Sequence, residues 1–304
     1  EAALSGAEGW VQVNIVIDEE GNVTDADVLD SIGPRSLRKA TLRAIKRWKY
    51  DPALINGEPV EQCKTIQIDY QISNYAGVTP RFRAFYNKSM ELYNAKKYDE
   101  LAEEVIDSKW EVTSNMTELR WLNTLKATYY SVTGDKEAQL HALRVATRKP
   151  RSTDFLFKLP KETVVNNLMS IFALEFTLKK YKDAIETYNS LQFVNADNTQ
   201  ETIAKLTPYY DEIIKIVSGN DPIFLEGKLN KNGTFSHRLV RNAFQITDIK
   251  DGELAILDIR CSRKRSRFTI EDNSLWSIPE SWGQCNVYIN GDTNTKFQLV
   301  EVQS

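Results

Sequence analysis

The chain has 304 residues, of which 41% are hydrophobic and 27% are charged. These fractions are typical of globular proteins and exclude an intrinsically disordered chain. With 39 basic and 42 acidic side chains the net charge is −3, which excludes the basic excess of a dedicated nucleic-acid binder. No run approaches the ~18 consecutive apolar residues of a membrane-spanning helix. Because the first residue is Glu1 rather than Met, we expect a processed or truncated product.

The glycines divide the chain into three parts. Six of the 13 glycines lie in residues 1–77 and six in residues 219–304, whereas Gly134 alone lies between them. Glycine destabilises a helix interior by about 1 kcal/mol and is frequent in hairpin turns. The distribution therefore predicts an α+β multidomain protein, with a strand-containing domain, a helical domain and a β domain. The predicted domains cover residues 1–76, 77–220 and 221–304.

The first domain is predicted to contain two strands, a helix and a third strand. Apolar residues alternate over 10–18, as in a half-buried strand, and a second strand begins at Val23 after the turn residues 18–22. Gly33-Pro34 then precedes a helical pattern of apolar residues. We expect this helix to end near Asp51, because the residue before a proline is disfavoured in the α conformation. The third strand shows alternating apolar residues at Ile66, Ile68, Tyr70 and Ile72.

Several of these residues resemble a known family. The resemblance rests on Gly9, Val11, Val13, Asp18, Gly21, Val23, the run AIKRWKYDPA at 44–53 and the run NGEPV at 56–60. Together these residues are similar to the C-terminal domain of TonB energy transducers, from about Gly6 to Ser73. The resemblance implies a β-β-α-β domain in the periplasm that binds a short peptide of an outer-membrane TonB-dependent transporter, the TonB box, by β-strand addition. The implied binding edge is the last strand, with Lys64, Thr65, Ile66, Gln67, Ile68, Asp69 and Tyr70.

The resemblance also implies a function and further partners. The expected function is energy-dependent transport across the outer membrane, with inner-membrane motor proteins as partners through a segment upstream of Glu1 that would also supply an anchor. No nucleic acid, small-molecule substrate or cofactor is expected. We interpret the basic residues between Arg35 and Lys49 as the solvated face of an amphipathic helix, balanced by acidic residues of the preceding hairpin. Trp48 and Tyr50 are expected to be core residues.

The middle of the chain repeats a short signature of lysines, small residues and acidic residues. The signature occurs at residues 96–101, 133–138 and 179–184. Each copy follows a stretch rich in aromatic and aliphatic residues, as at a turn between two helices. The pattern resembles tetratricopeptide (TPR) repeats, whose period is ~34 residues. The spacing here is wider, which we attribute to an insertion at 149–160, and a last helix at 199–217 would cap the array.

The last domain is predicted to be a small β-sandwich, because Asn-Gly and Asp-Gly turns separate short alternating runs. The predicted strands are 223–229, 234–240, 243–249, 253–260, 265–271, 285–289 and 296–302. Cys261 ends one strand and Cys285 begins another, so in a secreted protein we expect a disulfide between them. Cys63 is left over and is expected to be a small buried side chain. We interpret the basic turn at 263–267 as a solvated loop.

No catalytic or metal-binding motif stands out. The chain has two histidines, His141 and His237, in different predicted domains, which argues against a histidine-based metal site or catalytic triad. We therefore expect a binding protein rather than an enzyme, with no catalytic residue and no metal. Two alternatives stay open. In one, the chain is a cell-envelope scaffold that binds partners through its TPR-like array; in the other, it is an envelope enzyme with unrecognised carboxylate chemistry.

Overall fold

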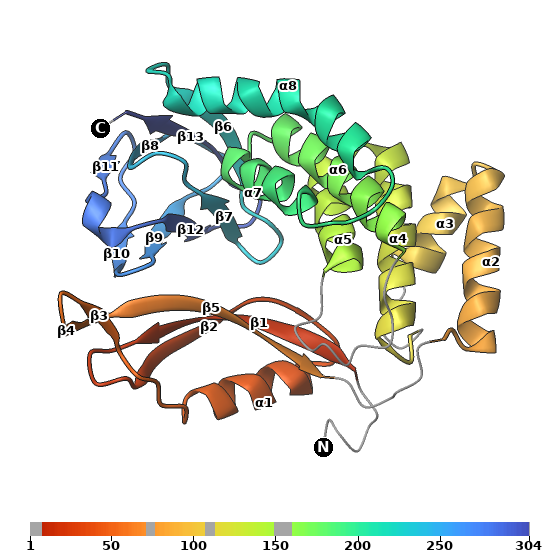
Figure 1. The fold of residues 1–304 in the computed structure, drawn as a ribbon, viewed down its shortest axis with the longest axis horizontal. Helices are drawn as coiled ribbons and strands as arrows, with labels where there is room; N and C mark the ends of the chain where they lie inside the picture. The colour runs from red at the N-terminus through yellow and green to blue at the C-terminus, as the bar shows by residue number, and fades with distance from the viewer. Residues whose placement is uncertain (1–7, 71–76, 107–112, 149–159, 304) are drawn as a thin grey trace.

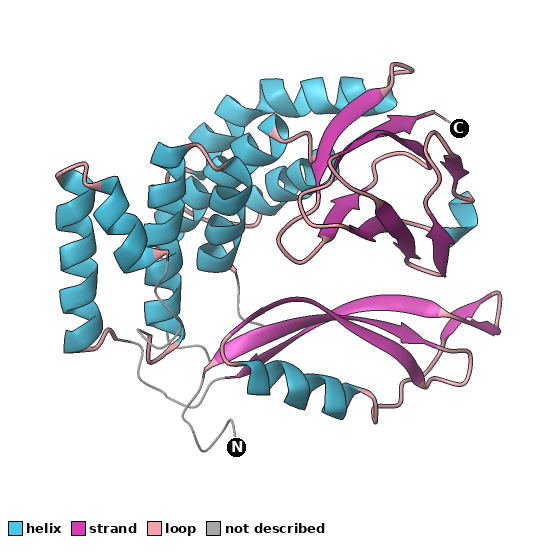
Figure 2. Cartoon of the chain, turned by 180° about the vertical axis from the view of Figure 1, so that it is seen from behind, coloured by secondary structure: helices cyan, strands magenta, loops and turns pink. Residues whose placement is uncertain are grey.

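The computed structural model describes residues 8–70, 77–106, 113–148 and 160–303. Figure 1 shows an N-terminal sheet with one helix beneath it, and above this sheet a row of helices followed by the C-terminal strands. Figure 2 shows the chain from behind and distinguishes the helices of the middle part from the strands at both ends of the chain. The observed order is strands with one helix, then helices, then strands, as the sequence predicts.

The N-terminal part is a three-stranded antiparallel sheet in the order β2-β1-β5, with helix α1 on one face. Its elements are β1 (Gly9–Ile17), β2 (Val23–Ile32), α1 (Arg35–Ile45), β3 (Ala53–Ile55), β4 (Glu58–Val60) and β5 (Gln62–Tyr70). The β-β-α-β order is confirmed. The short hairpin of β3 and β4 surrounds Asn56-Gly57, where the sequence predicted only a turn.

Helix α1 ends at Ile45, not near Asp51, so the predicted end was wrong. The chain beyond it pairs with the turn between β1 and β2, because Tyr50 N donates a hydrogen bond of 2.8 Å to Gly21 O. Gly21 has φ 83°, and a Cβ atom there would lie 1.9 Å from the Tyr50 carbonyl oxygen, so this contact requires glycine. Tyr50 packs against the domain core, but Trp48 is 39% exposed and is not a core residue.

Seven helices form the middle of the described chain. They are α2 (Pro80–Asn94), α3 (Tyr98–Val105), α4 (Met116–Thr133), α5 (Lys136–Thr147), α6 (Lys161–Thr177), α7 (Tyr181–Leu191) and α8 (Thr199–Ser218). None of these described helices combines the length and apolar character needed to cross a membrane.

The repeated signature falls on the turns between α2 and α3, between α4 and α5, and between α6 and α7. At each turn one residue has a left-handed backbone, with φ values of 57° at Lys96, 80° at Gly134 and 55° at Lys179. Such a residue ends a helix and lets the chain reverse. The three turns are therefore built in the same way, while the assignment as TPR repeats stays a prediction. The predicted insertion lies, except for its last residue, outside the described residues.

The C-terminal part has two four-stranded antiparallel sheets, with orders β10-β9-β12-β7 and β11-β8-β13-β6. The strands are β6 (Ile223–Lys228), β7 (Thr234–Arg238), β8 (Ala243–Lys250), β9 (Leu254–Cys261), β10 (Arg265–Thr269), β11 (Leu275–Ser277), β12 (Cys285–Gly291) and β13 (Lys296–Val302). A single turn of 3-10 helix, Glu280–Trp282, precedes β12. All seven predicted strands are present, and β11 is an additional one. The two sheets share one hydrophobic core, as a sandwich requires.

That core continues into the last helices. Phe172 of α6 and Tyr188 of α7 belong to the same buried cluster as Leu225 of β6 and Phe244 of β8. The Arg241 guanidinium also donates hydrogen bonds of 2.8 Å to the carbonyl oxygens of residues 216 and 219, at the end of α8. The hydrophobic core thus crosses residue 220, where the sequence suggested a boundary, and the three-domain division stays a prediction.

The N-terminal sheet packs against the other two parts with the face opposite α1, which we call the open face. Trp10 contacts Met116 and Leu119 at the start of α4. The Arg148 guanidinium lies 3.9 Å from the centroid of the Trp10 ring and donates a hydrogen bond of 2.9 Å to Gln12 Oε1. Such a stacked cation is attracted by the ring electrons. The sheet therefore lies between α1 on one face and the rest of the chain on the other (Figure 1).

Candidate peptide-binding site

Strand β5 forms one edge of the N-terminal sheet, since β1 is its only neighbour among the described strands. It pairs with β1 from Gly9↔Tyr70 to Ile17↔Gln62 without a register shift. Residues along a strand point their N–H and C=O groups alternately to the two sides. An edge strand therefore directs every second residue's peptide group away from the sheet.

The direction of each peptide group follows from two observed hydrogen bonds. Asp18 N donates to Asn22 O across the β1–β2 turn at 3.0 Å, so even-numbered residues of β1 face β2 and odd-numbered ones face β5. Odd-numbered residues of β1 lie opposite even-numbered residues of β5, as in the Val13↔Ile66 pair. The odd-numbered residues of β5 therefore face outward. Consistently, Cys63 N donates outward to Ser262 O at 3.3 Å.

Of the seven residues predicted for the binding edge, three can pair with an added strand through their main chain. Thr65, Gln67 and Asp69 direct their N–H and C=O groups outward by this alternation. The main chains of Lys64, Ile66, Ile68 and Tyr70 face β1 instead. Residues 71 and 72, which the resemblance also places in this strand, lie outside the described residues.

The side chains of β5 alternate between the two faces of the sheet. Even-numbered residues face α1: Ile66 is buried in the domain core, and the Tyr70 hydroxyl lies 2.6 Å from Thr41 Oγ1. Odd-numbered residues lie on the open face, where Asn14 Nδ2 donates a hydrogen bond of 3.3 Å to Thr65 Oγ1. A peptide added to this edge would continue the same alternation, so half of its side chains would point to the open face.

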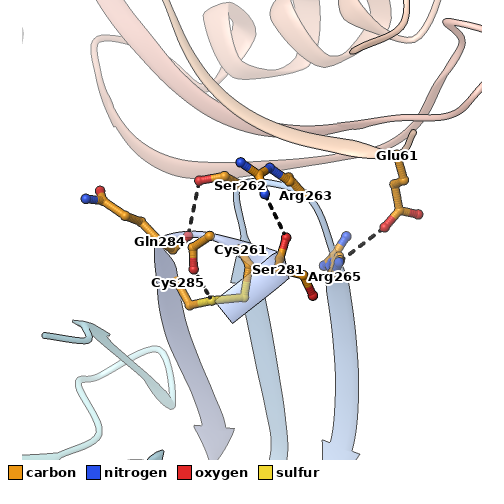
Figure 3. Close-up of a disulfide and its surroundings, with 9 residues drawn as sticks. Glu61, Cys261, Ser262, Arg263, Arg265, Ser281, Gln284 and Cys285 are labelled. Carbon is orange, nitrogen blue, oxygen red and sulfur yellow. Dashed lines mark hydrogen bonds between the residues drawn. A yellow bond between two sulfur atoms is a disulfide. The ribbon is translucent and has the colours of Figure 1, made fainter. Parts of the chain in front are cut away.

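The C-terminal part contacts one end of the β5 edge. In addition to the bond between Cys63 and Ser262, Arg265 N donates a hydrogen bond of 3.2 Å to Glu61 Oε1. Figure 3 shows Glu61 reaching across to Arg265 next to the loop that carries Ser262. An added strand can therefore extend along β5 from Thr65 onward, but not past Cys63 while this contact is in place.

The same loop follows a disulfide. Cys261 and Cys285 are bonded, as predicted, and they lie directly opposite each other on β9 and β12 (Figure 3). Cys63 is a free thiol and is only partly buried, where the sequence predicted a small buried side chain. Burial raises the pKa of the Cys63 thiol to about 11, so at neutral pH it is protonated and a poor nucleophile.

Charged side chains connect the open face with the C-terminal part. They form a group that we call the Asp/Arg cluster: Asp25, Asp27, Asp258, Arg260, Arg265 and Arg267. Arg260 Nη2 and Arg265 Nη2 each lie 2.8 Å from Asp27 Oδ2. The same two nitrogens lie 2.8 Å and 2.6 Å from Asp258 Oδ2. With three carboxylates and three guanidinium groups, the cluster is electrically neutral.

Asp258 lies at the centre of this cluster and its side chain is 3% exposed. Burial alone would raise the pKa of its carboxyl group, but the hydrogen bonds from Arg265 and Arg260 outweigh burial and lower the pKa to about 2. The pKa of Arg265 is raised in turn, because the hydrogen bonds and charges of the aspartates outweigh its own desolvation. The interpretation of residues 263–267 as a solvated loop was therefore wrong for Arg265, whose side chain is 9% exposed.

The comparisons with known proteins concern the N-terminal part. Residues 1–72 match the family described as Gram-negative bacterial TonB protein C-terminal. This part of the chain is a TonB C-terminal domain. A "Protein TonB" of Vibrio cholerae serotype O1 is 36% identical over 71 residues, which are 23% of this chain and 29% of that protein. The chain thus matches less than a third of this relative's length. No solved structure matches the chain.

The described residues contain no group of three or more His, Cys, Asp and Glu side chains that could hold a metal ion. Sequence reasoning identified the TonB domain, its last strand and the disulfide. It missed the Asp/Arg cluster and the contact of Ser262 with the edge. The contacts that link the N-terminal sheet to the C-terminal part join residues more than 190 positions apart, and the sequence carries no local pattern for such contacts.

Proposed function

We propose that this chain is a periplasmic TonB-like protein that binds a peptide segment of an outer-membrane transporter by strand addition along β5. In this role it takes part in energy-dependent transport across the outer membrane. The observation that carries the proposal is the edge position of β5 in a TonB C-terminal domain, with the peptide groups of Thr65 and Gln67 directed outward. An extended peptide recognises such an edge through main-chain hydrogen bonds, whatever its exact sequence.

The length of the accessible edge sets the expected affinity. Between Thr65 and Asp69 an added strand can form up to about six hydrogen bonds, each with a net contribution of about 1 kcal/mol. Ordering the peptide opposes most of this gain, since fixing each residue costs about 1–2 kcal/mol. Main-chain pairing alone is therefore expected to give only weak binding, with a dissociation constant in the millimolar range or above. A stronger complex requires contacts from the peptide's side chains.

The test is a titration of the full chain, isotope-labelled for NMR, with synthetic peptides from the periplasmic N-terminal segments of TonB-dependent transporters. The expected result is a saturable shift of the backbone amides of Thr65 and Gln67, larger than the shift of Ile66. A shift that is confined to α2–α7 would contradict strand addition and support the scaffold hypothesis. Unchanged amides at millimolar peptide would overturn the proposed function.

A further inference from the structure

A cavity of about 190 Å³ lies where all three parts of the chain meet. Asn14, Cys63 and Thr65 line it from the open face of the N-terminal sheet, and residues of α7, β7, β9 and β12 line it from the other side. No residue of β2 is part of the lining. The cavity therefore lies over β1 and β5, next to the edge that the proposed function assigns to the peptide.

The lining contains three cations and no carboxylate. The cations are Lys182, Arg238 and Arg260, and the other polar side chains include the amides of Asn14, Gln284 and Asn286. Arg238 contacts Asp183 and Glu186 through its Nη atoms. Arg260 Nη1 has a single weak contact, 3.5 Å from Asn14 Oδ1, so it keeps a hydrogen available for a further acceptor.

Lys182 differs from these two arginines because its ammonium group has no counter-ion among the described residues. Its side chain is partly buried, and it belongs to the first turn of α7. No side chain caps the N-terminus of this helix. Asp183 already places a carboxylate in the first turn of α7, so the helix terminus itself offers no site for an anion. The group of α7 that lines the cavity and favours an anion is the Lys182 ammonium.

The register of β5 determines which part of a peptide meets this cavity. A residue that pairs with Thr65 points its side chain to the same face as Thr65, with Cβ atoms about 5 Å apart. Thr65 itself lines the cavity, and the contact of Ser262 with Cys63 ends the accessible edge immediately beyond it. The side chain opposite Thr65 therefore lies at the end of the paired segment and beside the cavity.

We propose that this cavity binds the side-chain carboxylate of an aspartate or glutamate in the peptide, at the position paired with Thr65. The inference rests on the proposed function, since the peptide must first pair with β5. The carboxylate would accept hydrogen bonds from Lys182 and from Arg260 Nη1. A neutral amide at the same position cannot pair with the lysine charge. The cavity thus makes the edge selective for acidic peptides.

The test uses the full chain and two pairs of transporter-derived peptides. The peptides of one pair carry Asp or Asn at the position paired with Thr65, and those of the other pair carry Glu or Gln there. The binding constant of each peptide is measured by fluorescence anisotropy. We expect the acidic peptide to bind about tenfold more tightly, as a charge-assisted hydrogen bond provides. Lys182→Met should abolish this ratio, and Lys182→Arg, which keeps the charge, should retain most of it. Lys205→Met, which removes an exposed lysine of α8 paired with Glu201, is the control and should leave the ratio unchanged.

The outcomes separate this inference from the proposed function. An equal affinity for the acidic and the amide peptide, with the amides of Thr65 and Gln67 still shifted, overturns the cavity proposal and leaves strand addition intact. A tenfold ratio that survives Lys182→Met also overturns it, provided that the variant keeps the wild-type melting temperature. If neither peptide shifts the β5 amides, both proposals fail. A ratio that disappears in Lys182→Met and persists in Lys182→Arg supports the cavity as the acidic-residue site.

Discussion

The two faces of the N-terminal sheet are covered by different kinds of contact. On one face, Val13 and Ile15 of β1 pack against Leu37 and Ile45 of α1, which lie nearby in the sequence. On the open face, the Asp/Arg cluster joins β2 to residues more than 230 positions away. The first face is held by apolar burial and the second by ion pairs and a few aromatic contacts. A strand that is buried on both sides can therefore be stabilised by different interactions on its two faces.

Strand β1 illustrates the difference. The sequence predicted a half-buried strand, with odd-numbered residues inside, but Trp10, Asn14 and Val16 are buried as well. The prediction was wrong for these three residues because the helices and the C-terminal part cover the open face, whereas Gln12 is only partly buried. A polar residue such as Asn14 suits such a face, since it pairs with Thr65 instead of water.

The largest effect is expected on the α1 face. Ile15 is completely buried, so Ile15→Ala should lower the free energy of unfolding by about 4 kcal/mol, from lost burial plus the cavity left behind. Urea unfolding, followed by circular dichroism, measures this loss. The control is Leu54→Ala on the exposed β3–β4 hairpin, which should change stability by less than about 0.5 kcal/mol. Equal effects of the two substitutions would contradict the assigned core.

The disulfide lies beside the contact between the open face and the C-terminal part. Reduction should lower the unfolding free energy by about 3 kcal/mol, because the bond closes a loop between residues 24 positions apart. Thiol counting on the unfolded, unreduced protein should give one thiol, that of Cys63. In the native protein this thiol should react slowly with iodoacetamide at pH 8, since its pKa is about 11. A count of three thiols would contradict the disulfide.

A smaller loss is expected when the cluster on the open face is broken. Asp258→Asn removes the carboxylate between Arg260 and Arg265, and we expect a loss of about 2 kcal/mol, the equivalent of its lowered pKa. The control is Arg267→Met, because this side chain is 56% exposed and its ion pairs should contribute less than about 1 kcal/mol. Comparable losses from both variants would show that the cluster is a surface network.

The stability difference between the wild-type protein and Asp258→Asn is expected to depend on pH. The carboxyl group of Asp258 has a pKa of about 2 in the folded protein, below its ordinary value of 3.8. Its contribution to stability is therefore complete above the ordinary value and is lost as the pH falls toward 2. The difference in unfolding free energy between wild type and Asp258→Asn should be constant from pH 7 to about pH 5 and shrink below it. A difference that stays constant down to pH 2 would contradict the lowered pKa.

The sequence predicted those structural features that depend on a local pattern of apolar and turn-forming residues. The hairpin of β1 and β2, the turns at Lys96 and Lys179 and the order of the C-terminal strands all follow from apolar periodicity and turn residues. The end of α1 was missed because Lys49 and Tyr50 pair with the turn at Gly21 and Asn22, a tertiary contact that overrides the tendency to stay helical. The burial of Arg265 and the cavity lined by Lys182 were missed for a related reason. Contacts between segments far apart in the sequence leave no periodic pattern in it.

The central claim is that β5 binds a peptide through its outward peptide groups, and one substitution pair tests it most directly. Gln67→Pro removes the outward N–H of this edge position, whereas Gln67→Ala keeps it, and both remove the side chain that contacts Asp69. With a transporter-derived peptide and the full chain, we predict that Gln67→Pro weakens binding at least about tenfold and Gln67→Ala less than about twofold. Wild-type affinity in a folded Gln67→Pro variant would contradict strand addition at β5.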